Sequence, residues 1–322
     1  MPKRPDRHVR AFIPMQGNWD ISDETTTYLG PNQQQDRAVG VCLSASRFRS
    51  GTISVDVTFP SADSAARIVV GYNAATDSYY SIGLGGYGRG YVVDSFQPGR
   101  GWSALVARGD AAQLASYPTG SKSDTAEQRY HLVVQVDGQY VSLSVNDVRV
   151  IETSLPTPLQ GDQAGLFAWG NEHIKFTDFE VKSSEARVFV VMQFGEPYDS
   201  LYREVIKPVS QEMGFKAVRG DDVFRPGIIL QDIWRDIVSS DVIIAEITPA
   251  NPNVFYELGL AHAMGKQTVL LANRQIDKLP FDVSGYRVIF YDDTIGGKRD
   301  VERTLRLHLQ NIREGRTMQD AA

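Results

Sequence analysis

DVIIAEITPANPNVFYELGLAHAMGKQTVLL, which spans residues 241–271, contains two apolar runs on either side of a helical pattern. The run 242–247 is mostly apolar and is an expected strand. Residues 253–265 have helical spacing, and the run 267–272 is apolar again. A strand, a helix and a second strand are therefore expected in succession, as in the repeating unit of an α/β domain.

The same alternation continues on both sides of this stretch. Apolar runs predict strands at 187–192, 215–219 and 286–291, and helical spacing predicts helices at 198–213, 227–239 and 301–313. Gly214 suits the end of the first of these helices, because glycine adopts the left-handed conformation that often follows a helix. Five βα units in about 130 residues predict a flavodoxin-like, five-stranded parallel sheet of order 2-1-3-4-5.

In a sheet of this order, ligands bind outside the carboxyl ends of the strands, where strands 1 and 3 meet. Two loops are expected there, at 193–200 and 246–259. Asn251 can cap the following helix, and the backbone N–H groups at that helix start favour an anion such as a phosphate. The predicted substrate-binding residues are Gln193, Phe194, Gly195, Tyr198, Thr248, Asn251 and Asn253.

Glu257 falls in the second turn of this helix. Val254, Leu258 and Ala261 share the face that is expected to pack in the core, and Glu257 lies beside it, close to the crevice. A carboxylate in this place can stabilise positive charge on a sugar carbon, or form a covalent glycosyl intermediate, while an N-glycosidic bond is cleaved. The competing interpretation is an ordinary solvated glutamate on a helix.

The stretch 241–271 resembles the strand–loop–helix signature of nucleoside 2-deoxyribosyltransferases and of the related deoxynucleoside monophosphate N-hydrolases. The resemblance implies that Glu257, which stands in an ELG triplet, attacks the sugar carbon. It also implies an acidic residue in the helix before strand 3, for which Asp232 is the candidate and Asp236 the rival. The chain departs from the family at Asn251, where the family has an aspartate, and Tyr198 is the available substitute for a tyrosine in the first loop.

Three functions follow from these residues and this resemblance. The leading hypothesis is an enzyme that cleaves or transfers an N-glycosidic bond in a nucleoside, nucleotide or dinucleotide. TIR domains share the flavodoxin-like plan and place a working glutamate on the third helix, so NAD hydrolysis in bacterial antiviral defence is the alternative. The third hypothesis is a non-catalytic nucleotide-binding sensor. The absence of the family's aspartate at Asn251 supports it. No cofactor is expected, since NAD would be a substrate, and the transferase resemblance implies a homo-oligomer.

Residues up to about Glu185 have a different period. In GTISVDVTF, residues 51–59, apolar and polar side chains alternate, which predicts a half-buried strand. Asp137-Gly138 between two such runs indicates a hairpin turn. Many short strands separated by turns predict a β-sandwich. The further strands are expected at 131–136, 140–145, 148–151, 164–169 and 174–181.

Three segments of this half resemble a concanavalin A-like or laminin-G-like jelly roll: residues 66–86, 130–150 and 161–181. The chain is thus divided into a sandwich, residues 1–184, with a sensor or binding role, and an α/β domain, residues 185–322. A carbohydrate or another ligand could stack on aromatic side chains of the sandwich, although the same side chains also suit a core. These are Tyr79, Tyr80, Tyr87, Tyr91, Trp102 and Trp169.

Composition excludes several classes of protein. The chain has 322 residues, a formal net charge of −6 and no basic stripe, which disfavours duplex nucleic acid as a partner. Cys42 is the single cysteine, so neither a disulfide framework nor a cysteine zinc site is expected, and its apolar surroundings predict a buried strand residue. No signal peptide or membrane span is recognised, so we expect a cytoplasmic protein.

Two further patterns do not indicate a site. GLGGYG, residues 83–88, matches a dinucleotide fingerprint in form, but it lies among predicted strands and opens no helix. The five histidines are far apart in sequence, so no metal site is expected.

Overall fold

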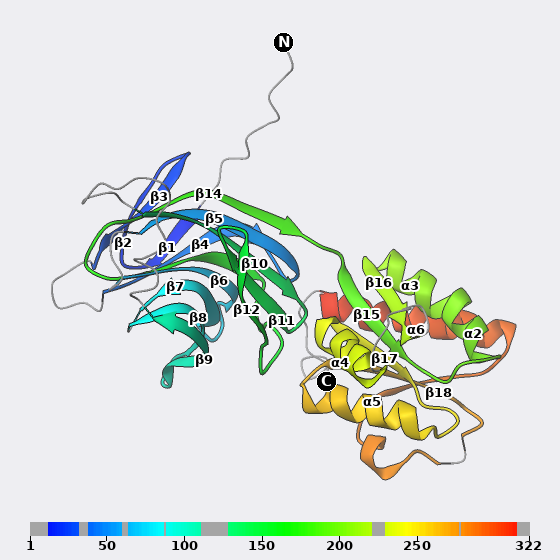
Figure 1. Cartoon of the computed structure of the whole chain (residues 1–322). Coiled ribbons are helices and arrows are strands. Elements are labelled where there is room, and N and C mark those ends of the chain that lie inside the picture. Colours follow the sequence, from blue (N-terminus) through cyan, green and yellow to red (C-terminus); the bar gives the residue numbers. More distant parts are fainter. Residues whose placement is uncertain are drawn as a thin grey trace. The chain divides into compact units, whose positions relative to one another are not determined.

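The computed structural model describes residues 12–31, 38–59, 64–86, 88–110, 128–220, 229–276 and 278–313. The chain forms two compact units, the first made mainly of residues up to Ser184 and the second mainly of residues from Glu185. Figure 1 shows the first unit as a β-sandwich and the second as a sheet with helices. Tyr87, one of the aromatic residues singled out above, lies outside the described residues.

The first unit contains two antiparallel seven-stranded sheets, as the alternating pattern predicts. One sheet, which we call sheet A, has the order β1 (Phe12–Gln16), β4 (Val39–Arg47), β13 (Gln163–Trp169), β6 (Ala65–Asn73), β7 (Ser78–Gly85), β8 (Arg89–Gln97) and β9 (Gly101–Asp110). The other, sheet B, has the order β12 (Val148–Ser154), β11 (Tyr140–Val145), β10 (Gln128–Asp137), β5 (Gly51–Phe59), β14 (Ile174–Ser183), β3 (Thr25–Gly30) and β2 (Asn18–Ile21).

The inner faces of the two sheets form the sandwich core. Ile53, Val55 and Val57 of β5 are fully buried there, which confirms the alternation seen in the sequence. Cys42 of β4 is also fully buried, and burial raises the pKa of its thiol to about 12, so it is an inert strand residue. Gly83 and Gly85 lie at the end of β7, and β8, which pairs antiparallel with it, begins at Arg89, so these glycines do not open a helix.

The second unit is built on a parallel sheet whose strand order confirms the prediction. The strands run in the order β16 (Phe215–Arg219), β15 (Ala186–Val191), β17 (Val242–Glu246), β18 (Gln267–Asn273) and β19 (Val288–Tyr291). In chain order this is 2-1-3-4-5, and the four neighbouring pairs are all parallel. The flavodoxin-like fold class is therefore established by the topology of the chain itself.

Helices cover both faces of this sheet. One face, with Val190 and Ile244, packs against the helical segment α2 (Tyr198–Leu201), η1 (Tyr202–Ile206) and α3 (Lys207–Glu212), and against α6 (Ile295–Arg313). The other face, with Phe189 and Ile243, packs against α4 (Ile229–Ser239), α5 (Pro252–Ala263) and the short η3 (Phe281–Val283). We call these the α6 face and the α5 face.

Two helices differ from the sequence expectation for local reasons. The predicted helix 198–213 contains a π-helical turn at Tyr202–Ile206, just before Pro208. Proline has no N–H to donate to the carbonyl four residues earlier, and the helix widens there. The last helix begins at Ile295 instead of residue 301, because the hydroxyl of Thr294 accepts the N–H of Gly297 at 3.0 Å and caps an additional turn.

Candidate functional site

The chain leaves the carboxyl ends of the neighbouring strands β15 and β17 in opposite directions. After β15 it continues into α2 on the α6 face, and after β17 it continues into α5 on the α5 face. In sheets of this order ligands bind where two such loops diverge, and we call this place the switch-point crevice. Both loops carry residues that the sequence singles out.

The loop after β15 is held in shape by Asp199. Gly195 has a φ of +96°, a conformation that favours glycine, and its N–H donates to the Asp199 carboxylate at 3.2 Å. Arg219, the last residue of β16, forms an ion pair of 2.7 Å with the same carboxylate, and this hydrogen bond holds the pKa of Asp199 below its usual range. The role of Gly195 is therefore to shape the loop with its backbone.

Phe194 projects from this loop and rests on Arg219. The guanidinium carbon of Arg219 lies 5.2 Å from the Phe194 ring centroid and 4.7 Å from that of Tyr202, so the cation is enclosed by two rings. Arg219 is buried, whereas Phe194 is 57% exposed. A large exposed ring that is held in place by a buried cation offers a flat surface for stacking.

The loop after β17 ends in a capped helix, as predicted. The side-chain oxygen of Asn251 accepts the N–H of Asn253 at 2.9 Å, and Pro252 is the first residue of α5. The amide nitrogen of Asn251 donates to Oε1 of Gln193 at 3.5 Å. Gln193 and Asn251, two predicted site residues from different loops, are therefore brought together across the crevice.

Glu257 lies on α5 beside the face that packs in the core. Val254, Leu258 and Ala261 are buried, and Glu257 is half-buried next to them. Burial raises the pKa of the Glu257 carboxyl to about 7. Among the residues that the structure describes, no side chain or backbone group is paired with this carboxylate. A group of this kind changes charge near neutral pH, which suits a catalytic carboxylate.

The structure distinguishes Asp232 from its rival Asp236. Asp236 is buried and pairs with Arg187 at 3.3 Å. Arg187 lies near the start of β15, at the amino-terminal ends of the strands, whereas the crevice is at their carboxyl ends. Asp232 lies in the first turn of α4, whose beginning faces the carboxyl edge, and it contacts Arg235 at 3.6 Å. Asp236 is therefore a structural ion-pair partner, and Asp232 is the candidate acid of this helix.

Two other predicted residues have their own contacts. Tyr198 packs on the α6 face and lines a pocket of about 330 Å³ with Asn273 and Tyr291, whereas Glu257 belongs to the α5 face. The hydroxyl of Thr248 accepts the N–H of Asn273 at 3.0 Å and so joins its loop to the end of β18. Their role in substrate binding stays a prediction.

Sequence reasoning missed Glu246, the last residue of β17. Its side chain is 1% exposed, and it accepts the N–H of Thr248 at 3.0 Å and the hydroxyl of Tyr291 at 3.1 Å. Burial raises the pKa of Glu246 to about 7. Glu246 therefore supports the first residues of the loop that leads to Asn251. The signal in the sequence was an acidic residue that directly ends the apolar run 242–245.

Glu246 should make stability depend on pH. Its pKa rises from 4.5 in the unfolded chain to about 7 in the fold, so between these values the native state binds more protons and stability falls as pH rises. Glu246→Gln cannot ionise. We expect its unfolding free energy, measured by urea denaturation, to decrease less than that of the parent between pH 5 and pH 8, by up to roughly 3 kcal/mol. An identical pH dependence in both proteins would contradict this assignment.

Comparison with known proteins gives similarities to solved structures. No protein-family model and no curated protein matches the chain. The carbohydrate-binding module CBM66 from Bacillus subtilis matches 52% of this chain and 92% of its own, with 16% identity and a TM-score of 0.40. The CMP N-glycosidase BcmB from Clostridium botulinum matches 38% of this chain and 98% of its own, with 22% identity and a TM-score of 0.30.

A third similarity is to a 2-deoxyribosyltransferase from Bacillus psychrosaccharolyticus, which matches 36% of this chain and 90% of its own, with 14% identity and a TM-score of 0.30. All three similarities are distant. The fold of each unit is established by its strand order and not by these matches.

Two classes of feature are absent from the described residues. No group of three or more histidine, cysteine, aspartate or glutamate side chains in this part of the chain is placed to hold a metal ion. Within the same ranges, no helix combines the length and the apolar character that crossing a membrane requires.

Proposed function

We propose that the C-terminal unit cleaves or transfers the N-glycosidic bond of a nucleoside, nucleotide or dinucleotide, with Glu257 as the nucleophile or as the group that stabilises the oxocarbenium ion. The observation that carries the proposal is the half-buried Glu257 carboxylate, which has no partner among the described residues and lies on the helix that leaves the switch-point crevice. Its ELG setting, which resembles that of the deoxyribosyltransferases, supports the same role.

The proposed reaction uses two carboxyl groups. Glu257 attacks the anomeric carbon, or faces it as positive charge develops, while the bond to the base breaks and the base leaves with the bonding electrons. A departing purine or pyrimidine takes a proton, for which Asp232 is the proposed donor, whereas the nicotinamide of NAD leaves as a neutral molecule and takes none. Water or a second base then displaces Glu257 from the sugar, and this step decides between hydrolysis and transfer.

Substrate binding is assigned to the two loops. The exposed ring of Phe194 is the proposed stacking surface for the base, and the capped start of α5 is the proposed contact for a phosphate or a ribose hydroxyl. Gln193 and Asn251 lie between these positions and offer amide groups to the ligand.

The activity should depend on pH through Glu257. Attack requires the ionised carboxylate, and the pKa of this group is about 7. For NAD, whose nicotinamide leaves without a proton from Asp232, we therefore expect kcat/KM to fall as pH decreases below 7, approaching a tenfold loss per pH unit, and to level off above about pH 8. Initial rates of base release in buffers of constant ionic strength test this. A flat profile between pH 5 and pH 8 would show that kcat/KM does not depend on the ionisation of Glu257.

Phe194→Ala should weaken substrate binding more than it affects chemistry. Loss of a base-stacking ring costs about 1–3 kcal/mol, so KM should increase roughly tenfold or more while kcat changes little. Phe281→Ala is the matched control, because Phe281 is 90% exposed on η3 and is not part of the two loops. Equal KM values for the two variants would exclude Phe194 as the stacking surface.

The proposal is tested by product analysis. The full chain is incubated separately with deoxynucleosides, nucleoside monophosphates and NAD, and the products are separated by chromatography. Free nucleobase identifies a nucleoside or nucleotide as the substrate, and free nicotinamide identifies NAD. Binding of any of these compounds without turnover identifies a sensor and contradicts the catalytic proposal.

A further inference from the structure

The outer face of sheet A is unusual in being apolar. A sheet that packs on a core with one face normally presents polar side chains on the other. Here the second face carries its own buried cluster, drawn only from strands of sheet A, with half-buried aromatic rings packed against it. Trp102 and Trp169 are two of these rings. The cluster itself is buried, so its half-buried rings are the part of this face that a ligand can reach.

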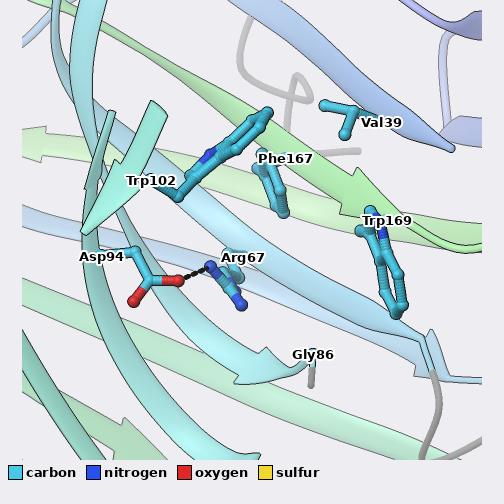
Figure 2. Close-up of a pocket in the computed structure, with 7 residues that line it drawn as sticks. All are labelled: Val39, Arg67, Gly86, Asp94, Trp102, Phe167 and Trp169. Carbon is cyan, nitrogen blue, oxygen red and sulfur yellow. Dashed lines mark hydrogen bonds and ion pairs between the residues drawn. The ribbon is translucent and has the colours of Figure 1, made fainter. Parts of the chain in front are cut away.

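A buried ion pair lies within this apolar surface. Figure 2 shows the Arg67 guanidinium and the Asp94 carboxylate beside the rings of Trp102, Phe167 and Trp169. Arg67 is 2% exposed, and its Nη1 donates to Asp94 Oδ2 at 2.6 Å and to the Ser81 hydroxyl at 3.3 Å. Placing two charges here costs desolvation energy, so the stability of the pair depends on how completely its hydrogen bonds are made.

One N–H donor of the Arg67 guanidinium has no hydrogen-bond acceptor among the described residues. Nη2 donates to the carbonyl of Gly85 at 2.7 Å, but within the described part of the chain the buried Nε–H has no acceptor. A buried N–H of a charged group that lacks a partner is destabilising, so it calls for an acceptor from outside the protein. Gly86 allows the guanidinium to lie here, because a Cβ at that position would lie 2.7 Å from Nη2 of Arg67.

The size and polarity of the cavity define the missing group. The cavity has a volume of about 20 Å³, which is room for a single water-sized group. Arg67 Nε needs an acceptor, and the carboxylate of Asp94, which accepts Arg67 at 2.6 Å and Arg89 at 3.5 Å, has a lone pair for one more donor. A hydroxyl accepts and donates and has the size of this cavity, whereas a carboxylate or phosphate is larger than one water-sized group. The indoles of Trp102 and Trp169 at the same pocket can then pack against the C–H groups of the molecule that carries the hydroxyl.

We propose that this pocket binds a saccharide. One hydroxyl accepts the N–H of Arg67 Nε and donates to Asp94, and the C–H face of the sugar ring lies against Trp102 and Trp169. This site is in the sandwich, so it is separate from the proposed catalytic function and does not depend on it.

The test uses the full chain and the methyl glycosides of glucose, galactose and fructose. Trp102 and Trp169 are two of the four tryptophans, so binding should give a saturable change in tryptophan fluorescence, with a Kd checked by calorimetry. Trp169→Ala should weaken binding about tenfold, because it removes one stacking surface without touching the buried ion pair. Trp234→Ala, which removes a 44% exposed tryptophan of α4, and Glu257→Gln should both leave the Kd unchanged.

Three results would contradict the proposal. If none of the three glycosides binds, the cavity holds only a water molecule and the aromatic face is structural. If a glycoside binds to the Trp169→Ala protein with the affinity of the parent, it binds elsewhere. Arg67→Lys is a second variant that retains the charge but removes the Nε–H, and a folded Arg67→Lys protein with parental affinity would also exclude the assigned hydrogen bond.

Discussion

Glu257→Gln should lower the rate of base release by at least about a hundredfold, which corresponds to roughly 2.7 kcal/mol of transition-state stabilisation. The substitution retains the shape of the side chain and removes its charge. Substrate affinity should change much less, because the charge matters most when the sugar carbon becomes positive. Thermal stability should not decrease, since burial already disfavours the ionised form of this carboxyl.

The control for this variant is Glu302→Gln on α6. Glu302 is also a half-buried helix glutamate, but it lies on the helix that covers the opposite face of the sheet. Its substitution should leave turnover unchanged within about twofold. Asp232→Asn, measured beside them, should slow the release of poor leaving groups most, because its proposed role is proton donation. Full activity of Glu257→Gln would show that Glu257 is not catalytic, and the C-terminal unit would then be interpreted as a binding module.

Asp94→Ala should destabilise the sandwich by about 3–5 kcal/mol. It removes the carboxylate that pairs with the buried Arg67 and leaves an uncompensated charge in an apolar environment. Urea denaturation followed by tryptophan fluorescence measures the effect, because Trp102 and Trp169 report on the same unit.

The matched comparison is Asp162→Ala, which removes a carboxylate that pairs with the exposed Arg47. Surface ion pairs contribute about 0–1 kcal/mol, so this variant should be nearly as stable as the parent. Arg67→Met combined with Asp94→Leu should recover much of the loss, because neither charge is then buried. Similar stabilities of Asp94→Ala and Asp162→Ala would show that the buried pair is not important to the fold.

The arrangement of the α/β unit was predictable because it depends on local patterns. Apolar runs without alternation, helical spacing and short connections limit the topology to a doubly wound sheet, and the sheet order then places the loops 193–200 and 246–259 at one edge. The cap at Asn251 was also predictable, because it depends on a side chain and a backbone group that are two residues apart.

The remaining features depend on contacts between distant residues, which a single sequence does not reveal. Glu246 owes its burial and its hydrogen bond to Tyr291, a partner that is 45 residues away. Asp232 and Asp236 are one helical turn apart, and only the ion pair of Asp236 with Arg187 distinguishes them.

The surroundings of Tyr198 illustrate the same limit. Tyr198 begins α2 and packs against the core of the α6 face, a contact with residues far along the chain.

The function that we propose for this chain is cleavage of an N-glycosidic bond by the carboxylate of Glu257. The most direct measurement is the release of free base, or of nicotinamide, from the panel of deoxynucleosides, nucleoside monophosphates and NAD, with the parent and the Glu257→Gln protein at equal concentration. We predict that the parent releases base from at least one member and that the variant releases it at least about a hundredfold more slowly. No release of base by the parent from any member, or equal release by both proteins, would contradict catalysis by Glu257.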